Sequence, residues 1–570
     1  MGKTDIPVRE LVAMIKSGEL RLPEMQRRYV WRSTRVRDLL DSLYRGYPSG
    51  SILVWETDKE HPTQEMSVVQ NKSPFAGHIL LLDGQQRLTS LASIINGEPL
   101  IVRGRRRPID ILFNLDHPEH LIDFSEVDSD SISLSSDEEE VEELDEEGED
   151  MNLIERLRQM TFVVASNSLA QQRNWISVSK VFKTQSDSEI LIAAGVASFE
   201  DPRYEKYSSR IKKLRSILDY TYSMNVLPKD LSYEEVAEIF VRVNSLGVKL
   251  RGSDLALAQI TARWQKSLSL LQDFQEECEE YWMTLDLGLL VKSMVVFATD
   301  QSKFNKVYSI SVPNLKSGWE KAKEGLRFAI NFLRLNAGIE DESLLSSPFF
   351  FIVIAYFGIL KNEKLKPEEE RLLKYWLYVA SAKGRYSRGS SESILDADLK
   401  ILKTGGSPQD LIKALEQQFG RLTFNVADFT GRGISSPLFP LMFLALKSND
   451  ARDWYSGLPI SLNTIGKNHS LQYHHIFPKS LLKGKFEKSE SNEIANMAFI
   501  AGKTNRSISN KLPKDYLPEI ISVRGENALL NQSVPVETSL FELDNFGLFL
   551  ERRRQMLTDL VNGFVESIIK

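Results

Sequence analysis

Residues 471–478 of this chain read LQYHHIFP, and residues 496–511 read NMAFIAGKTNRSISNK. The runs are short, rich in apolar residues and bounded by turn residues, and the second continues into a helical spacing. Together they predict a strand, a turn, a second strand and a helix. Three of the seven histidines, His469, His474 and His475, lie within seven positions, two of them in the first run. The fold expected for the C-terminal part of the chain follows from these two runs.

The same residues have the chemistry that cutting a phosphodiester bond requires. Such a site must deprotonate a water, neutralise developing charge and stabilise the leaving oxygen. A neutral imidazole can accept the proton near pH 7, and one divalent ion can do the rest. Because adjacent residues on a strand point to opposite sides, one histidine of the pair can be the base and the other a ligand. Asn505, at the predicted helix start, can supply a second ligand through its side-chain oxygen.

The order His-His-Ile-x-Pro, then Asn496 before the second strand and Asn505 at the helix, resembles the HNH or ββα-metal nuclease family. The match is close to the HNH domain of CRISPR nucleases. This resemblance implies that His475 is the general base and that His474 and Asn505 are the metal ligands. It also implies that Asn496 pins the loop that carries the base. Three of these four catalytic positions thus lie on the two predicted strands or just before the second one.

Two basic residues near this motif, Arg506 and Lys511, are candidates for contacts with nucleic-acid phosphates. His474 stands where many relatives have Asp or Glu, which shifts the expected metal from Mg²⁺ towards Mn²⁺, Ni²⁺ or Zn²⁺. The alternatives are a chance histidine pair or a structural zinc site. The two asparagines in the expected order favour the nuclease. We expect His469 to be a surface residue.

Length and composition limit the class of protein. With 570 residues the chain exceeds one hydrophobic core, so roughly two to four domains are expected. No stretch approaches the roughly 20 uninterrupted apolar residues of a membrane helix, and residues 1–10 lack the apolar core of a secretory signal. The single cysteine, Cys278, excludes an internal disulfide and a cysteine-based zinc cluster within one chain. We therefore expect a protein of the reducing cytoplasm.

The formal net charge of −7 depends on one segment. Residues 126–150 hold 14 acidic residues and no Lys or Arg. The rest of the chain has 71 basic and 64 acidic residues, a formal charge of +7, and is compatible with a phosphate-rich partner. The acidic segment cannot form a packed core. We expect a solvated, disordered loop, and a DNA mimic that competes for a basic groove is the alternative.

A second motif occupies residues 79–89, which read ILLLDGQQRLT. An apolar strand leads into Asp83 and Gly84 and then into a helix, whose first backbone amides form an anion site. Arg87 on the first turn can add a bidentate phosphate contact, and Asp83 can hold a metal or a hydroxyl. Gly84 permits a close approach of the backbone. For this turn taken alone, a simple capped helix is the alternative.

Two further runs accompany this turn: residues 23–31 read PEMQRRYVW, and residues 240–250 read FVRVNSLGVKL. All three runs resemble the family catalogued as domain of unknown function 262, which shares the ParB/sulfiredoxin-like fold. Nucleotide binding and hydrolysis recur in that fold. The C-terminal motif resembles the partner family numbered 1524. By the first resemblance, the nucleotide-binding positions are Gln26, Arg27, Asp83, Gly84, Gln85, Gln86, Arg87 and Asn244.

The patterns predict a helix-rich α+β chain of three parts. Residues 1–252 alternate helices and strands, and by the resemblance we expect them to form a ParB-like nucleotide-binding and DNA-sensing domain, which includes the acidic loop. We expect residues 253–420 to form a helical connecting domain, and the resemblance implies that residues 421–570 form the HNH nuclease domain. A capping box at Ser232 and Glu235 predicts a helix that begins at residue 233. Other expected helices span about residues 203–220, residues 253–278, 317–335, 349–360 and 368–381, and about residues 546–569. Apolar runs at residues 51–56 and 78–82 predict buried strands.

Chains that pair these two families resemble the GmrSD-type modification-dependent restriction enzymes and the SspE-type effectors of phosphorothioate-linked defence. The resemblance implies a type IV DNA endonuclease of anti-phage defence that cuts with Mg²⁺ or Mn²⁺. It also implies an NTPase activity of the N-terminal module on GTP, UTP or CTP. The expected partner is modified double-stranded phage DNA, with no membrane, and a homodimer is left open. The alternatives are a DNA-binding nucleotide switch with an inactive nuclease domain, and an RNA-cutting toxin.

Overall fold

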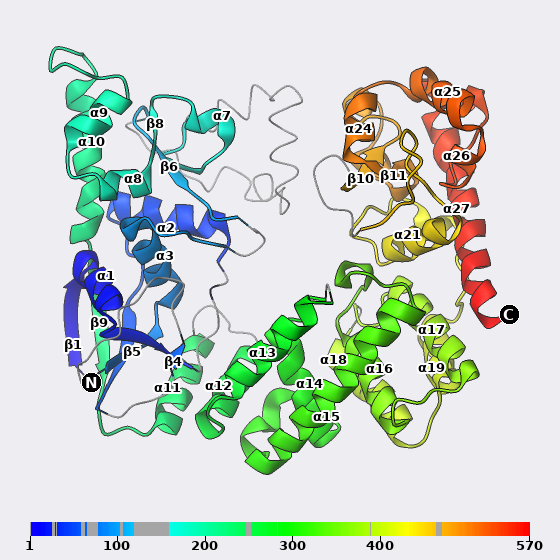
Figure 1. Cartoon of the computed structure of the whole chain (residues 1–570), viewed down its shortest axis with the longest axis horizontal. Helices are drawn as coiled ribbons and strands as arrows, with labels where there is room; N and C mark the ends of the chain where they lie inside the picture. Colours follow the sequence, from blue (N-terminus) through cyan, green and yellow to red (C-terminus); the bar gives the residue numbers. More distant parts are fainter. Residues whose placement is uncertain are drawn as a thin grey trace. The chain divides into compact units, whose positions relative to one another are not determined.

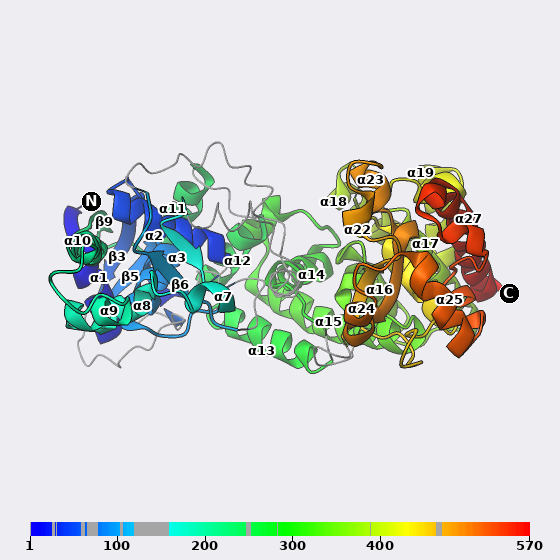
Figure 2. The ribbon, with the colours of Figure 1, turned by 90° about the horizontal axis from the view of Figure 1, so that it is seen from above.

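The computed structural model describes residues 2–24, 29, 31–58, 63–64, 78–102, 107–118, 159–246, 252–281, 283–387, 389–462 and 470–570. The chain divides into two compact units, Met1–Leu268 and Ser269–Lys570. Helices predominate, and sheets occur in both units, so the expected helix-rich α+β class is confirmed (Figures 1 and 2). The domain boundaries at residues 252 and 420 stay predictions. Gln26, Arg27, His469 and the acidic segment lie outside the described residues.

A mixed sheet is the centre of the first unit. Its strands are β1 (Gly2–Pro7), β2 (Leu20–Pro23), β3 (Ile52–Thr57), β4 (Thr63–Gln64), β5 (His78–Asp83) and β9 (Thr221–Leu227). Within the described residues, their order across the sheet is β1-β9-β3-β5-β2-β4. The pairs β3 with β9 and β2 with β5 are parallel, and the other neighbours are antiparallel. The two strands predicted from apolar runs, β3 and β5, thus lie side by side in the middle.

Helices cover both faces of this sheet. They are α1 (Val8–Ser17), α2 (Ser33–Arg45) and α3 (Gln85–Asn96) on one side, and α11 (Tyr233–Leu246) and α12 (Gly252–Arg263) on the other. Along β3, Ile52 and Val54 join the core of the first group, whereas Leu53 and Trp55 join the core of the second. This follows from the period of two along a strand. A sheet buried on both faces explains why these strands are continuous apolar runs.

The predicted strand-to-helix turn at Asp83 is present. β5 ends at Asp83 and α3 begins at Gln85, with Gly84 between them at φ 100°. This left-handed backbone conformation favours glycine, and a Cβ atom there would lie 2.5 Å from Cδ1 of Ile52, whose side chain would have to shift. The capping box is also present, because Ser232 N donates to Glu235 Oε2 at 2.8 Å and Glu235 N donates to Ser232 Oγ at 3.2 Å.

A small antiparallel sheet completes the first unit. It consists of β6 (Ile111–Asn114), β7 (Phe162–Val164) and β8 (Trp175–Ser177), in the order β7-β6-β8. The expected helix at about residues 203–220 is α10 (Tyr204–Arg215), which continues as a 3-10 helix over Ser216–Asp219. β6 and β8 lie beside each other in both views of the ribbon (Figures 1 and 2).

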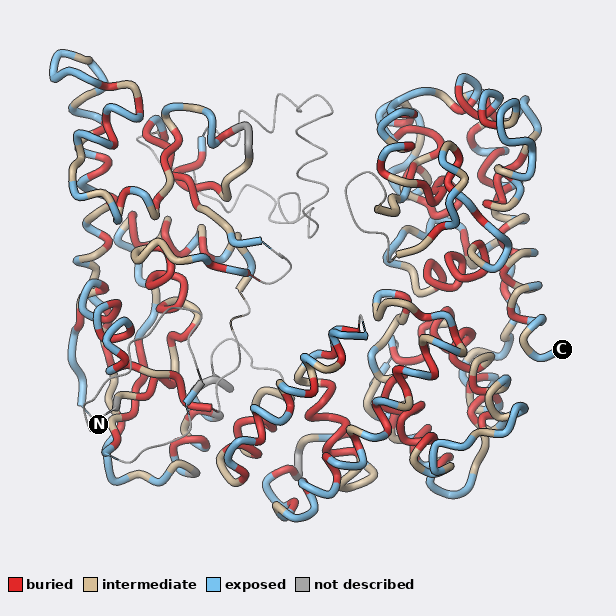
Figure 3. The backbone as a smooth tube through the Cα atoms, viewed as in Figure 1, coloured by how far each residue is buried: buried red, intermediate tan, exposed pale blue. Residues whose placement is uncertain are grey.

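The first part of the second unit is helical. Its main helices are α13 (Ser267–Glu279), α14 (Leu287–Thr299), α15 (Val312–Asn331), α16 (Phe349–Leu360), α17 (Pro367–Ala382), α18 (Ser391–Lys403) and α19 (Pro408–Phe419). α16 is apolar and buried over nearly its whole length (Figure 3). A Cβ on Gly318 would lie 2.8 Å from Met294 O, and one on Gly325 would lie 2.9 Å from Ala355 O. At these two glycines, α15 therefore packs so closely against α14 and α16 that a side chain would collide with the neighbouring backbone.

Two predicted helices differ from the observed ones. Residues 253–278 form α12 and α13 rather than one helix, because Lys266 has φ 66°. The buried carboxylate of Glu24 accepts hydrogen bonds from the backbone N–H groups of Lys266 and Leu268 at 3.1 Å each, which satisfies the start of α13. The predicted helix 317–335 begins earlier, since Ser311 caps α15, and it changes to a π-helix over Phe332–Asn336.

The last part of the unit has the predicted order of strand, strand and helix. Its elements are α20 (Val426–Phe429), α21 (Leu438–Ser448), β10 (Leu471–His475), β11 (Met497–Ala501), α24 (Gly502–Ile508), α25 (Pro513–Arg524) and α27 (Phe546–Ile569). α27 is the expected terminal helix and packs against α17 and α21. In the described parts of the chain, no helix has both the length and the apolar character needed to cross a bilayer.

Candidate active site

The hairpin of β10 and β11 places the two adjacent histidines on different sides. The strands are antiparallel, with His474 opposite Ala498 and His475 opposite Met497. Tyr473 is 41% exposed, whereas His474 is 3% exposed. The alternation along β10 therefore turns His474 into the interior, and α24 follows β11 directly.

His474 and Asn505 are brought together by this arrangement. Nδ1 of His474 lies 2.8 Å from Oδ1 of Asn505 on α24. The Asn505 side-chain amide donates to Oε1 of Gln472 at 2.8 Å, which fixes its orientation and leaves Oδ1 facing the imidazole. Two residues 31 positions apart in the sequence thus present a nitrogen and an oxygen to one point.

The other ring nitrogen of His474 lies next to Tyr516 on α25. The Tyr516 hydroxyl lies 3.1 Å from Nε2 of His474 and 3.0 Å from the carbonyl oxygen of Ile476. A carbonyl can only accept, so when the hydroxyl donates to Ile476 O, its oxygen accepts from Nε2–H of His474. Burial lowers the pKa of His474 to about 4, so the ring is neutral and carries a single N–H. Nδ1 then carries a lone pair.

This proton arrangement bears on whether the residues fit a metal ion. With Nε2 protonated, the lone pairs of His474 Nδ1 and Asn505 Oδ1 face each other at 2.8 Å, and a cation relieves that contact. Neutral imidazole nitrogen and amide oxygen are accepted ligands of divalent ions. Within the described residues, no cluster of three or more His, Cys, Asp or Glu side chains is arranged around a metal position. The pair fits a divalent ion that completes its coordination with substrate or water.

His475 lies next to this pair and is half-buried. Burial, followed by the charge of Lys479 and by His474, lowers the pKa of His475 to about 3, while a hydrogen bond with the Asn492 side chain opposes this. Its Nε2 has no hydrogen-bond partner in the part of the chain that the structure describes. The ring is therefore neutral near pH 7, and its buried Nε2 has no partner among the described residues.

Asn496 ties the turn after β10 to the start of β11. It is fully buried, its Oδ1 accepts from Phe477 N at 2.9 Å, and its Nδ2 donates to Phe477 O and Ser491 O at 3.0 Å each. Ile476 N also donates to Asn496 O at 2.8 Å. The two candidate phosphate-contacting residues, Arg506 and Lys511, are exposed and follow Asn505 in the chain.

Several supporting residues were missed by sequence reasoning. Arg553 of α27 is fully buried and donates to the carbonyls of Ala495 at 2.9 Å and Met497 at 2.6 Å, on either side of Asn496. Asp453 accepts from Ala501 N at 2.7 Å and from the Thr504 hydroxyl at 2.8 Å, at the first turn of α24. None of these side chains belongs to a local motif, so no sequence signal identified them.

At the N-terminal motif, the Arg87 side chain contacts other protein groups, whereas the sequence predicts a contact with phosphate. Its guanidinium donates to the carbonyls of Ser49 and Ser51 and pairs with Asp83 at 3.2 Å. It also lies 5.8 Å from the centre of the Tyr222 ring. Arg87 thus holds the loop before β3 against the start of α3, and its phosphate role stays a prediction.

The other predicted nucleotide-binding positions have mixed placements. The Asp83 side chain is 40% exposed, and Gln85 is buried. Oε1 of Gln86 accepts from Trp31 N at 3.1 Å. Asn244 lies in α11, and the structure does not describe its side chain. Asp83, Gln85, Gln86 and Arg87 are therefore together at one helix start, and the remaining positions are untested.

Comparisons with known proteins place the N-terminal part. Residues 8–261 match the family model described as GmrSD restriction endonuclease, N-terminal domain. The chain is also similar to MJ0686 of Methanocaldococcus jannaschii, described as an uncharacterized protein, with 24% identity over 97% of each chain. The family match includes β5, α3 and α11 and ends before the second unit. Residues 8–261 are therefore similar to the N-terminal domain of GmrSD restriction endonucleases.

Proposed function

We propose that this chain is a nucleoside-triphosphate-regulated, modification-dependent DNA endonuclease that cuts with a divalent metal ion at the β10–β11–α24 site. The observation that carries the proposal is the approach of His474 Nδ1 and Asn505 Oδ1 to 2.8 Å. His475 is next to His474 on β10, and its Nε2 has no partner among the described residues. The family of the N-terminal part supports a DNA substrate. We place its action in the cytoplasm, against modified phage DNA.

In this proposal the residues have separate roles. His474 and Asn505 hold a divalent ion, Mg²⁺ or Mn²⁺, which when bound supplies Lewis-acid stabilisation of the charge that develops on the scissile phosphate and the leaving oxygen. Nε2 of His475 takes a proton from the attacking water, since its lone pair is free at neutral pH. The bonds of Asn496 to Phe477 fix the turn that carries His475. Arg506 and Lys511 position the strand through its phosphates.

The N-terminal module supplies the control in this proposal. The start of α3 presents backbone amides next to Asp83 and Gly84, which suits the phosphates of a nucleoside triphosphate. GTP, UTP and CTP are the candidates. An unregulated nuclease would endanger the host genome, so we propose that triphosphate and modified DNA change the activity of the His475 site. Such coupling requires two states with different ligand affinities.

A digestion experiment tests this function. The full-length protein is incubated with plasmid and with phage DNA that carries different base modifications or phosphorothioate links, in Mg²⁺, Mn²⁺ or EDTA. Each mixture is tested with GTP, UTP, CTP, ATP and no nucleotide. We expect cleavage of one modified substrate that requires metal and that changes with one triphosphate. Equal digestion of RNA and DNA, or identical rates with and without every nucleotide, would contradict the proposed selectivity and control.

In the same assay, Arg87→Ala tests whether nucleotides act on cutting through the N-terminal module. We expect it to remove triphosphate hydrolysis and to blunt the effect of nucleotide on cutting. Because Arg87 also holds the Ser49 and Ser51 carbonyls, thermal unfolding of the variant is measured in parallel. Arg9→Ala is the matched control, since Arg9 is an exposed arginine of the same unit whose ion pair with Asp219 lies on the surface.

A further inference from the structure

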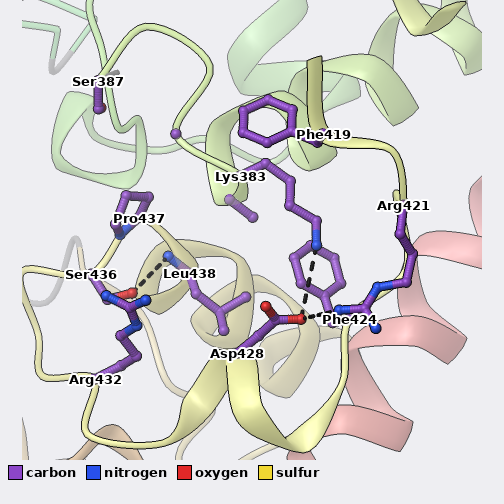
Figure 4. Close-up of a pocket in the computed structure, with 12 residues that line it drawn as sticks. Lys383, Ser387, Phe419, Arg421, Phe424, Asp428, Arg432, Ser436, Pro437 and Leu438 are labelled. Carbon is purple, nitrogen blue, oxygen red and sulfur yellow. Dashed lines mark hydrogen bonds and ion pairs between the residues drawn. The ribbon is translucent and has the colours of Figure 1, made fainter. Parts of the chain in front are cut away.

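A cavity of about 410 Å³ lies in the second unit, outside the candidate active site. It opens where the end of α17, the end of α19, α20 and the start of α21 meet (Figure 4). Its lining residues that matter here are Lys383, Phe419, Arg421, Phe424, Asp428 and Arg432. This volume is of the size that holds a small ligand, which for protein sites is about 300–1,000 Å³.

Positive charge dominates the lining. Three cationic side chains, Lys383, Arg421 and Arg432, face a single carboxylate, Asp428. Oδ2 of Asp428 is shared, because Arg421 pairs with it at 3.0 Å and Lys383 lies 3.9 Å from it (Figure 4). The Lys383 side chain is 12% exposed, so its charge acts in a partly desolvated place. A formal surplus of two positive charges favours an anionic ligand.

Arg432 lies across the pocket from the other two cations (Figure 4). It is exposed, and among the described residues no acceptor pairs with its guanidinium. Its backbone is held firmly, since Arg432 N donates to Phe429 O at 3.1 Å and Arg432 O accepts from Ile494 N at 2.7 Å. A fixed backbone that carries an uncommitted guanidinium is suited to a bidentate contact with a phosphate.

The pocket also has aromatic and apolar walls. Phe424 is 5% exposed and lies 4.3 Å below the Lys383 ammonium, and Phe419 is half-buried at the rim. Pro437 and Leu438 complete the apolar side. Cations next to aromatic rings are the combination that binds a nucleotide, because the phosphate pairs with the cations and the base stacks on a ring.

The loop that carries Arg432 contacts the segment beside His475. Gly431 N donates to Glu493 Oε2 at 2.8 Å, and Glu493 is fully buried and bound by Arg554 at 2.6 and 2.7 Å. The residue before Glu493 is Asn492, whose side chain hydrogen-bonds His475. The pocket and the candidate active site therefore share one tightly bonded segment of the second unit.

We propose that this pocket binds a nucleotide, with the phosphate against Arg432 and Lys383 and the base against Phe419. We assign the nucleotide to a nucleic-acid strand that extends from the candidate active site. That assignment of the source rests on the proposed nuclease function, whereas the affinity of the pocket for a nucleotide does not. A free nucleotide has the same chemistry, and the test separates the two sources.

Binding is measured on the full-length protein in EDTA, so that no cutting occurs, by the fluorescence anisotropy of a short labelled single strand of DNA. We expect Arg432→Ala to weaken binding about tenfold and to lower the slope of log affinity against log salt by about one. Arg371→Ala is the matched control, since Arg371 is an exposed arginine on α17 that does not line the pocket. We expect it to bind as the wild type does.

Phe419→Leu tests the stacking without changing the charge. We expect it to weaken binding of the normal strand and to leave binding of an abasic strand unchanged. Competition by a mononucleotide at the affinity of the strand would assign the pocket to a free nucleotide, and failure to compete supports the strand. The proposal is overturned if Arg432→Ala and Phe419→Leu both bind the strand and the mononucleotide as Arg371→Ala does. Because EDTA is present, this result does not depend on whether the His475 site cuts.

Discussion

The Tyr516 hydroxyl lies 3.1 Å from Nε2 of His474, and it can donate its only proton to Ile476 O at 3.0 Å. This relationship sets which nitrogen of His474 carries a proton. It leaves the Nδ1 lone pair directed at Asn505, which is the state that a metal ligand requires. Tyr516 is 42 residues beyond His474 and outside the motif, yet it determines how the motif can act.

Tyr516→Phe removes the hydroxyl that orients His474. We expect metal affinity to fall by about 10–100-fold, which is the usual cost of losing a residue that orients a ligand. Calorimetric titration with Mn²⁺ measures the affinity, and ¹⁵N spectra of labelled histidine report the His474 tautomer. Tyr455→Phe is the control, since it makes the same chemical change on a nearby half-buried tyrosine. Unchanged Mn²⁺ affinity with an unchanged tautomer would show that Tyr516 only fills space.

Asn505→Ala removes the partner of His474 Nδ1, which is also the oxygen that the proposal assigns to the metal ion. We expect cutting in Mg²⁺ to be lost and to return in part as the Mn²⁺ concentration rises, because a weakened site is filled by mass action. Asn505→Asp keeps an oxygen at the same position and should retain more activity than the alanine variant. DNA binding in EDTA serves as the second readout. If DNA affinity falls while the metal response is unchanged, Asn505 is not a ligand.

Arg553→Met removes a buried cation that donates to four backbone carbonyls: Ser533, Ala495, Met497 and Gln532. Because a hydrogen bond from a charged donor is worth about 1.5–3 kcal/mol, and its loss leaves buried acceptors unpaired, we expect local stability to fall by about 3 kcal/mol or more. Hydrogen exchange of the amides in β10 and β11 should accelerate accordingly. Arg552→Met is the control on the same helix, since Arg552 is half-exposed. Equal exchange in both variants would contradict the role of Arg553.

The two site histidines should stay neutral in mild acid. Burial, the largest cause for both, lowers the pKa of His474 to about 4 and that of His475 to about 3. Their imidazole resonances should therefore remain at the neutral position at pH 5, while exposed histidines titrate near about 6.5. Unfolded histidines bind protons first as the pH falls, so the folded state loses stability between about pH 6.5 and about 3, the folded-state pKa of His475. Titration of either ring near its ordinary pKa would show that it is exposed to solvent.

The local motifs predicted the elements that carry the site. The apolar runs of β3 and β5, the glycine after Asp83, and the order of β10, β11 and α24 all followed from period, turn chemistry and spacing. They succeed because each depends on residues close together in the sequence. His474 and Asn505 lie together, as the resemblance to the HNH family implies, and their role as metal ligands stays a prediction.

Contacts over long sequence distances could not be predicted in this way. The break between α12 and α13 depends on Glu24, which lies more than 240 residues from Leu268. The bonds of Arg553 and Asp453 to the β11 segment likewise join elements with no shared pattern. Arg87 has the residue type of a phosphate ligand, but in the fold it bonds two carbonyls of the preceding loop. Only the tertiary structure decides between such uses of one side chain.

The most direct test of the central claim is the rate of metal-dependent DNA cleavage by His475→Ala, measured on the substrate that the wild-type protein cuts. We expect the rate to fall by about 10²–10⁴-fold, while Mn²⁺ affinity, thermal unfolding and triphosphate hydrolysis stay unchanged. Tyr473→Phe, the control on the neighbouring position of β10, keeps its ring against Phe439 and Phe499 and should cut at the wild-type rate. A His475→Ala protein that cuts within about threefold of the wild-type rate would contradict the assignment of His475 as the base.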